Sequence, residues 1–319
     1  MAQRIAIIAA DDIGIHDDDS AIGENIASST TSLTDSILDY RKENGRTYHR
    51  FREGKYHYPN DDRENQRLDL QHHLFLRTFD GALGLAPPAV RGAKPGRVLD
   101  LGTGTGIWAV DYGEENPEAE VIGVDLSPIQ PDFVPPNVEF QIDDVEDDWT
   151  YTKPFDYIHS RMMTSSIANW PKYIERCFQA LKPGGYLELQ EGALYPNSDD
   201  GTLKPDSAMW KAIALLDEAT TKFGRPFQPV ERLTPMMEAA GFEGLVEARF
   251  AWPSNPWPRD RALKELGAWN HENMTSGLSG FFMAPLTRAE GWRTEEVEAT
   301  MVGVRRDFAD RGIHAYWPM

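Results

Sequence analysis

Three glycines at alternating positions form the segment of this chain whose residue types and spacing are best suited to holding a ligand. They lie in Asp100-Leu101-Gly102-Thr103-Gly104-Thr105-Gly106, directly after the apolar run Val98-Leu99. Glycine lets the backbone turn sharply and lets a ligand approach main-chain atoms closely. The dinucleotide fingerprint G-x-G-x-x-G would place a glycine where Ile107 stands, so the spacing disfavours a pyrophosphate-binding loop. The segment instead predicts a phosphate-free ligand with its amino-acid end near a strand tip.

S-adenosylmethionine is a ligand of this kind. We expect Gly102, Thr103 and Gly104 to offer it backbone surface and amide donors, and Gly106 to complete the loop before the next helix. The carboxylate of Asp100 would lie near the ammonium group of the ligand. The alternative is a glycine turn that belongs to some other α/β fold.

Acidic residues follow at the ends of the next two predicted strands. Asp125 ends the strand expected at 121–125, where its carboxylate would accept hydrogen bonds from both ribose hydroxyls. After the strand expected at 138–141, a carboxylate of Asp143 or Asp144 would accept the adenine amine, and the Val145 amide would reach a ring nitrogen. Aspartate is also common in loops after strands, so an ordinary loop role stays open for each of the two.

His159 is the best candidate for a general base, because it ends the strand expected at 155–159. Substrates meet cofactors at this edge of open α/β sheets. A base is needed only when the accepting atom is an oxygen or a protonated amine. The alternative is a histidine that hydrogen-bonds to the cofactor or to a neighbouring loop. No metal site is expected, since Cys177 is the single cysteine and the adjacent His72 and His73 would diverge by about 100° on a helix.

Alternating strand and helix signals would position these residues. Besides the strands already given, the sequence predicts strands at 98–101, 186–190 and 245–252, and helices at 34–44, 60–83, 107–115, 171–182, 206–223 and 231–240. This alternation is typical of an α/β fold with a mostly parallel, doubly wound sheet. We expect an acidic, Ser-rich disordered tail at 1–36, a helical N-terminal lid at 37–95, a cofactor-binding core at 96–252 and a helical, Trp-rich cap at 253–319.

The charge of the chain restricts its partners. It has 51 acidic and 32 basic residues and a formal net charge of −19. A phosphate backbone would repel such a surface, so we expect no nucleic-acid partner. No apolar run approaches the ~20 residues of a membrane span, so we expect no membrane partner and a cytoplasmic location, with the nucleus as the alternative.

The sequence resembles the fungal methyltransferases that are similar to LaeA, a regulator of secondary metabolism. The resemblance implies a Rossmann-like class I methyltransferase fold and a helix bearing Tyr48 that closes over S-adenosylmethionine, although ordinary helix packing of Tyr48 is an equal alternative. It also implies that the cofactor is lined by Gly102, Gly104, Asp125, Leu126, Asp144 and Val145. The blocks that carry it are 40–49, 67–73, 98–108, 143–149, 155–161, 181–191 and 313–318.

Three functions fit this resemblance. The first is methylation of a small-molecule acceptor of secondary metabolism. The second is a nuclear regulator that acts through protein partners, and the third is a methyltransferase-fold enzyme that catalyses a reaction other than methyl transfer. Relatives continue past the Tyr316-Trp317-Pro318 segment with a strand that closes the sheet. We therefore expect an open sheet edge, or an edge covered by a helix, a protein partner or a second copy of the chain.

Overall fold

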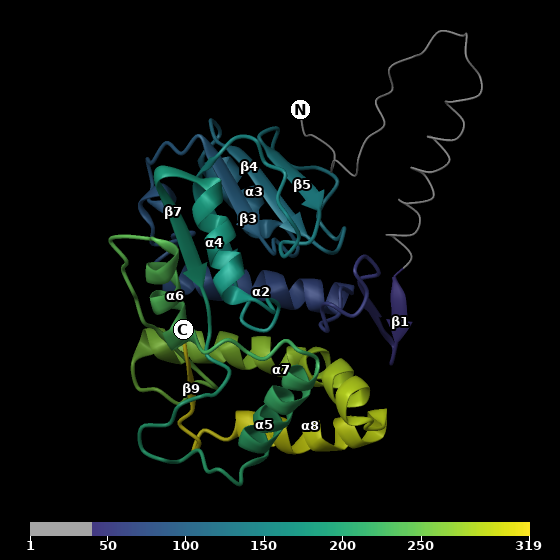
Figure 1. The fold of residues 1–319 in the computed structure, drawn as a ribbon. Helices are drawn as coiled ribbons and strands as arrows, with labels where there is room; N and C mark the ends of the chain where they lie inside the picture. The colour runs from purple at the N-terminus through teal and green to yellow at the C-terminus, as the bar shows by residue number, and fades with distance from the viewer. Residues whose placement is uncertain (1–39) are drawn as a thin grey trace, which may run out of the picture.

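The computed structural model describes residues 40–319, and its centre is a five-stranded parallel sheet (Figure 1). The order across the sheet is β5-β4-β3-β6-β7. The reversal of order at β3 and β6 is that of a doubly wound α/β sheet, which confirms the predicted fold class. The tail predicted at 1–36 lies outside the described residues. The strands are β3 (Arg97–Leu101), β4 (Glu120–Asp125), β5 (Val138–Ile142), β6 (Phe155–Arg161) and β7 (Leu181–Gln190).

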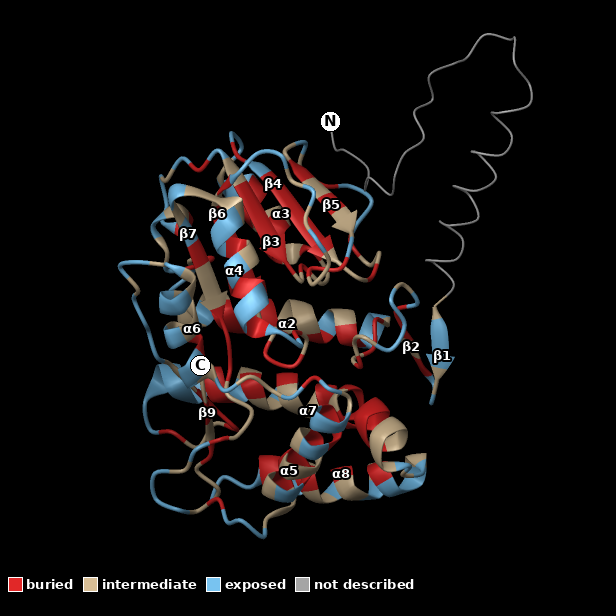
Figure 2. Ribbon diagram, in the orientation of Figure 1, coloured by how far each residue is buried: buried red, intermediate tan, exposed pale blue. Residues whose placement is uncertain are grey.

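Apolar side chains cover both faces of this sheet. Helix α3 (Ile107–Glu115) packs on one face, in a cluster that contains Val98 and Tyr157. Helices α4 (Trp170–Ala180) and α6 (Leu233–Ala240) cover the other face, in a cluster that contains Leu99 and Ile158. Successive strand residues point to opposite faces, so a strand buried on both sides must be apolar throughout. The buried residues in Figure 2 are accordingly continuous along the central strands.

A helical layer lies beyond the carboxyl ends of the strands (Figure 1). Helix α2 (Asp62–Thr78) begins at the N-cap Asp61, whose side chain accepts a hydrogen bond from the Glu64 amide. It packs against the 30-residue helix α7 (Arg261–Glu290), which also contacts α5 (Ala208–Lys222) and α8 (Thr294–Ala309). Short 3₁₀ helices lie at Pro87–Ala89 and Val230–Arg232. A third apolar cluster joins these helices, so the helical layer has a core of its own beside the two that cover the faces of the sheet.

The prediction of a helix at 34–44 is wrong for residues 40–44, the part of this range that the structure describes. Strands β1 (Arg41–Glu43) and β2 (Arg46–Tyr48) form an antiparallel hairpin instead. The two residues of its turn, Asn44 and Gly45, have φ values of +50° and +75°. An Asn-Gly pair favours this left-handed turn, which matches the twist of a hairpin and ends any helix. The segment predicted as a helical N-terminal lid therefore begins, where the structure describes it, with a hairpin and an irregular segment before helix α2.

The strand predicted at 245–252 does not join the central sheet. Only Ala251–Pro253 is extended (β8), and it pairs antiparallel with β9 (Tyr316–Pro318) in a separate two-stranded sheet. The pairing brings Trp252 opposite Trp317 and buries both in the helical core. Burial of these two rings is the physical reason why this segment pairs with β9 and not with the central sheet. Among residues 40–319, no strand pairs with the outer side of β7, so the strand predicted at 245–252 does not form the edge of the sheet.

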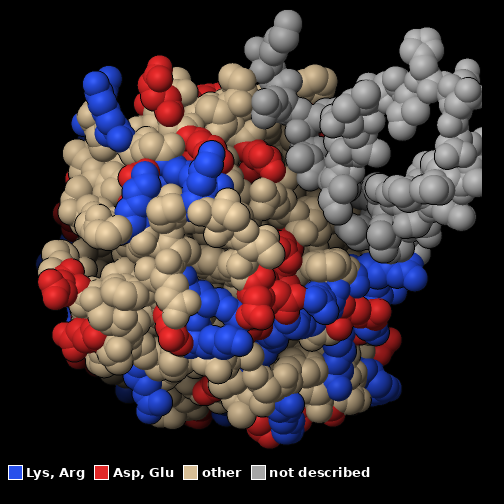
Figure 3. Space-filling view, turned by 45° about the horizontal axis from the view of Figure 1, so that its top comes forward, with Lys and Arg blue, Asp and Glu red and all other residues tan. Residues whose placement is uncertain are grey.

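Two further properties concern the whole described chain. Within residues 40–319, no helix has the length and apolar character needed to cross a membrane. The same residues contain no group of three or more His, Cys, Asp or Glu side chains able to hold a metal ion. Lys and Arg are interspersed with Asp and Glu on the face drawn in Figure 3, rather than gathered in one basic surface.

Candidate functional site

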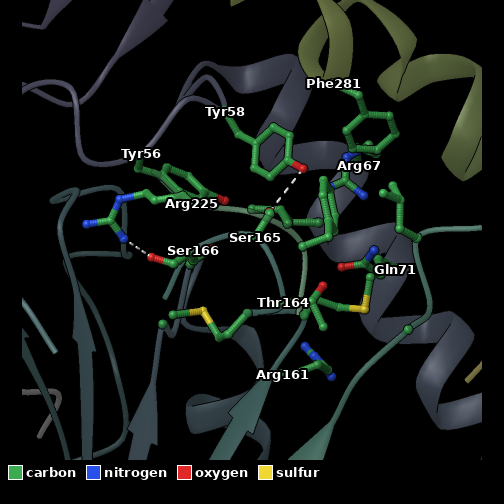
Figure 4. Close-up of a pocket in the computed structure, with 18 of the residues that line it drawn as sticks. Tyr56, Tyr58, Arg67, Gln71, Arg161, Thr164, Ser165, Ser166, Arg225 and Phe281 are labelled. Atoms are coloured by element: carbon green, nitrogen blue, oxygen red, sulfur yellow. Dashed lines mark hydrogen bonds between the residues drawn. The ribbon is translucent and has the colours of Figure 1, made fainter. Parts of the chain in front are cut away.

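A cavity of about 230 Å³ lies between the carboxyl edge of the sheet and the helical layer. The glycine loop after β3 and the ends of β4, β5 and β6 form one wall. The segment that leads into α2, together with α2 itself, forms another, and apolar side chains from α5, α7 and the β8–β9 sheet complete it. Figure 4 shows part of this lining in close-up. The sheet and the helical layer therefore share one cavity.

Backbone hydrogen bonds hold the glycine loop in its shape, and the space around it leaves no room for a side chain at Gly106. The amides of Gly102 and Thr103 both donate to the carbonyl oxygen of Val124, at 2.9 Å. Gly102 and Gly106 have φ values of +70° and +80°, where glycine is strongly favoured. A Cβ atom on Gly106 would lie 2.3 Å from the Phe140 ring. Gly102, Thr103 and Gly104 line the cavity, whereas Gly106 is the N-cap of α3 and packs away from it.

Asp125 connects the end of β4 to this loop. Its Oδ2 atom accepts a hydrogen bond from the Gly104 amide and its Oδ1 atom accepts one from the Ser127 amide, both at 2.9 Å. Burial raises the pKa of Asp125 to about 6. Each carboxylate oxygen keeps a lone pair free and the residue lines the cavity, so it can accept two more hydrogen bonds. Leu126 lines the cavity beside it. The predicted ribose site fits this geometry.

The third predicted element also faces the cavity, through Asp143, Asp144 and Val145. The Asp144 amide donates to Oδ1 of Asp143 at 2.8 Å, which fixes the turn after β5. The buried carboxylate of Asp144 forms an ion pair with Lys55, from the segment that precedes α2. Oδ2 of Asp144 thus already has a charged partner, and the ion pair joins the segment that precedes α2 to the turn after β5.

The structure does not bring Tyr48 to the site. It lies in strand β2 with 1% of its surface exposed, and the Arg288 guanidinium lies 4.6 Å from its ring centroid. The expectation of a lid helix bearing Tyr48 is therefore corrected, since a ring covered in this way cannot reach the cavity. Tyr56 and Tyr58 line the cavity instead. Ser165 donates a hydrogen bond of 3.2 Å to the Tyr58 hydroxyl (Figure 4).

His159 and Asp100 lie beneath the loop and outside the cavity lining. Nδ1 of His159 is 2.7 Å from Oδ1 of Asp100, and the His159 ring stacks on Trp108 with centroids 3.8 Å apart. Oδ2 of Asp100 accepts a 2.5 Å hydrogen bond from the Thr103 hydroxyl. Strand β6 continues to Arg161, so His159 is inside the sheet and only 1% exposed. The structure therefore does not bring His159 or Asp100 to the cavity, where their predicted roles as general base and as partner of the ligand ammonium would place them.

Several lining residues were missed by sequence reasoning. Arg67 and Gln71 come from α2, Arg161 ends β6, and Arg225 follows α5. An arginine at a strand end was a usable signal for Arg161. Arg67 and Gln71 lie in the block 67–73 that carries the family resemblance, but only tertiary packing brings them and Arg225 to the cavity.

Comparison with known proteins gives a consistent family. A model of the methyltransferase domain matches residues 70–247. Methyltransferase pytC of Aspergillus terreus is 44% identical over 289 residues, which cover 90% of this chain and 88% of pytC. Secondary metabolism regulator LAE1 of Cochliobolus heterostrophus is 41% identical, with 86% of this chain and 91% of the relative covered.

Among solved structures, the [4+2]-cyclase SpnF is 17% identical, with 92% of each chain covered and a TM-score of 0.45.

Proposed function

Since this chain belongs to the class I S-adenosylmethionine-dependent methyltransferases, among the fungal pytC- and LaeA-like proteins, we propose that it methylates a small-molecule acceptor of secondary metabolism. The observation that carries this proposal is that the glycine loop and an apolar wall line the same cavity. That wall includes Leu216, Trp252 and Phe282. Mostly apolar sites with a few polar groups are typical of small-molecule pockets.

The residues around the loop fit the cofactor. Gly102 to Gly104 would give backbone surface to its amino-acid end, and Asp125 would accept hydrogen bonds from the ribose hydroxyls. Asp143 or Val145 would contact adenine, while Asp144 stays paired with Lys55. S-adenosylmethionine supplies a methyl group on a sulfonium, from which the neutral thioether leaves readily.

The chain would contribute mainly alignment and exclusion of water. No histidine is among the described residues that line the cavity. Acceptors that need no strong base, such as a neutral amine or an ionised oxygen, suit this lining best. Holding the acceptor in line with the methyl group can lower a barrier by up to ~7–11 kcal/mol in well-oriented systems. We place this reaction in the cytoplasm.

The test incubates the full chain with metabolite extract from its native host and S-adenosylmethionine carrying a deuterated methyl group. Mass spectrometry should find a labelled product together with S-adenosylhomocysteine. Asp125→Ala is the matched control and should give little product, because the ribose contacts are lost. Tight binding of S-adenosylhomocysteine without any labelled metabolite would contradict the small-molecule proposal.

The similarity to the regulator LAE1 supports a second candidate, a nuclear regulator that acts through protein partners. Purification of the tagged chain from host nuclei would test it. A stable partner that is retained by both the wild type and Asp125→Ala, with no labelled metabolite from either, would favour regulation over biosynthesis.

A further inference from the structure

Four cationic side chains line the cavity, and three of them have a carboxylate partner. Lys55 pairs with Asp144, Arg225 with Glu146 at 2.7 Å, and Arg67 with Glu64 at 2.7 Å. The fourth is Arg161, at the end of β6. Among residues 40–319, no carboxylate forms a hydrogen bond or ion pair with its guanidinium. Figure 4 shows this group across the cavity from Tyr58.

Arg161 is held in place by a neutral partner. Its Nη1 and Nη2 atoms both lie 3.3 Å from Nδ1 of His72. Nε2 of His72 is 2.9 Å from Oδ2 of Asp111, on α3. Asp111 can only accept at that oxygen, so these partners assign the ring proton to Nε2 and leave a lone pair on Nδ1 for Arg161. Burial also lowers the pKa of His72, which keeps the ring neutral.

The guanidinium remains charged in this environment. Burial lowers the pKa of Arg161 to about 10, while the charges of Asp100 and Asp111 act in the opposite direction. The Phe75 ring, with its centroid 4.9 Å away, supports one side of the group. A guanidinium with five donors and one weak, shared acceptor has most of its hydrogen-bonding capacity unused. A charge that is partly withdrawn from water is costly unless it is paired, so the half-buried Arg161 guanidinium is suited to an anionic ligand.

We infer that Arg161 binds a carboxylate in the cavity, and that Asp111 and His72 position its guanidinium for this contact. Two molecules of the proposed reaction could supply the carboxylate: the methionine end of the cofactor, or an acidic acceptor. The inference rests on the proposed function and adds a binding residue to its site. Arginine suits this task because its planar fork matches a carboxylate with two parallel hydrogen bonds.

The first arm of the test uses two nucleosides that differ by the amino-acid end. S-adenosylhomocysteine carries the carboxylate and 5′-methylthioadenosine lacks it. Calorimetry on wild type and Arg161→Gln gives the ratio of their affinities. If the cofactor supplies the carboxylate, the preference for S-adenosylhomocysteine over 5′-methylthioadenosine should be about tenfold lower in Arg161→Gln than in the wild type. The affinity for 5′-methylthioadenosine should be the same in both proteins.

The second arm titrates benzoate into protein saturated with S-adenosylhomocysteine. If the acceptor supplies the carboxylate, the nucleoside preference stays the same in both proteins, and benzoate binding in the wild type is lost in Arg161→Gln. An unchanged nucleoside preference together with unchanged benzoate titration would overturn the inference.

Control variants separate binding from folding. Arg77→Gln removes an arginine of α2 that pairs with Glu265 outside the cavity, so it should keep the nucleoside preference. If the cofactor supplies the carboxylate, His72→Phe should lower the preference for S-adenosylhomocysteine by about threefold without changing 5′-methylthioadenosine affinity, since Arg161 loses its orientation. If the acceptor supplies it, His72→Phe should weaken benzoate binding by about threefold instead. If Arg161→Gln does not fold, Arg161→Lys replaces it, and its loss of bidentate binding should still cost about threefold.

The two proposals fail in different ways. A wild-type protein that binds no S-adenosylhomocysteine would contradict the proposed function, and benzoate titration of the free protein would then still test Arg161. Equal results for wild type and Arg161→Gln in both arms would overturn the inference about Arg161 and leave the proposed function standing.

Discussion

Nδ1 of His159 lies 2.7 Å from Oδ1 of Asp100, in adjacent parallel strands directly below the glycine loop. The other carboxylate oxygen of Asp100 accepts from the Thr103 hydroxyl. The histidine therefore supports the loop through Asp100, and Trp108 covers the face of its ring. We therefore expect this pair to affect cofactor binding only through the glycine loop, which leads to the first prediction.

Replacing His159 should reduce stability and leave the pH dependence of methyl transfer unchanged. His159→Ala removes a hydrogen-bond partner from a buried carboxylate and opens space beside Trp108. We expect the free energy of unfolding to fall by about 1–3 kcal/mol, measured by urea titration. His159→Gln keeps a donor and should lose less. A pH–rate profile that changes shape in His159→Gln would support His159 as a general base.

The affinity for S-adenosylhomocysteine should decrease as the pH falls through about 6. Burial raises the pKa of Asp125 to about 6, so the carboxylate is charged above this pH and protonated below it. Protonation removes acceptor capacity that the ribose hydroxyls would use, and we expect a roughly threefold to tenfold loss by calorimetry. Asp125→Asn, which cannot titrate, should show no such step. A wild-type affinity that is flat across this range would exclude Asp125 from the nucleoside contacts.

Tyr58, rather than Tyr48, should affect cofactor binding. The Tyr58 ring lines the cavity, whereas the Tyr48 ring lies under the Arg288 guanidinium. We expect Tyr58→Ala to weaken S-adenosylmethionine binding by about threefold or more, through lost contact with the ligand. Tyr48→Phe is the matched control and should bind normally. The reverse result would mean that the segment before α2 rearranges when the cofactor binds.

Side chains should be tolerated differently within the glycine loop. A Cβ atom at Gly106 would lie 2.3 Å from Phe140, while one at Gly104 would meet nothing closer than Leu68 Cδ1 at 3.5 Å. Both glycines have positive φ, so each alanine carries backbone strain, but only Gly106→Ala adds a clash in the core. We expect it to be less stable than Gly104→Ala by about 1–3 kcal/mol in urea titration. Equal stability of the two would show that Phe140 moves aside at little cost.

The sequence alone determined the order of the cavity-facing elements along the sheet edge. The glycine loop, Asp125 and the Asp143–Val145 segment follow three strands that are adjacent in the chain and in the sheet. Parallel strands joined by right-handed crossovers present their carboxyl ends at the same edge, so apolar patterning and glycine spacing were sufficient to place them together.

Only the tertiary structure decided which side chains complete the cavity. Tyr58 meets Phe281 edge to face, and Arg67 reaches Asn273, across more than 200 residues of sequence. His159 and Arg161 lie two positions apart on β6, yet one ring is stacked inside the sheet and the other side chain lines the cavity. Such outcomes depend on where a strand ends and on how distant helices pack against it. Local residue patterns set the path of the backbone, but they do not set the contacts between segments that are far apart in the chain.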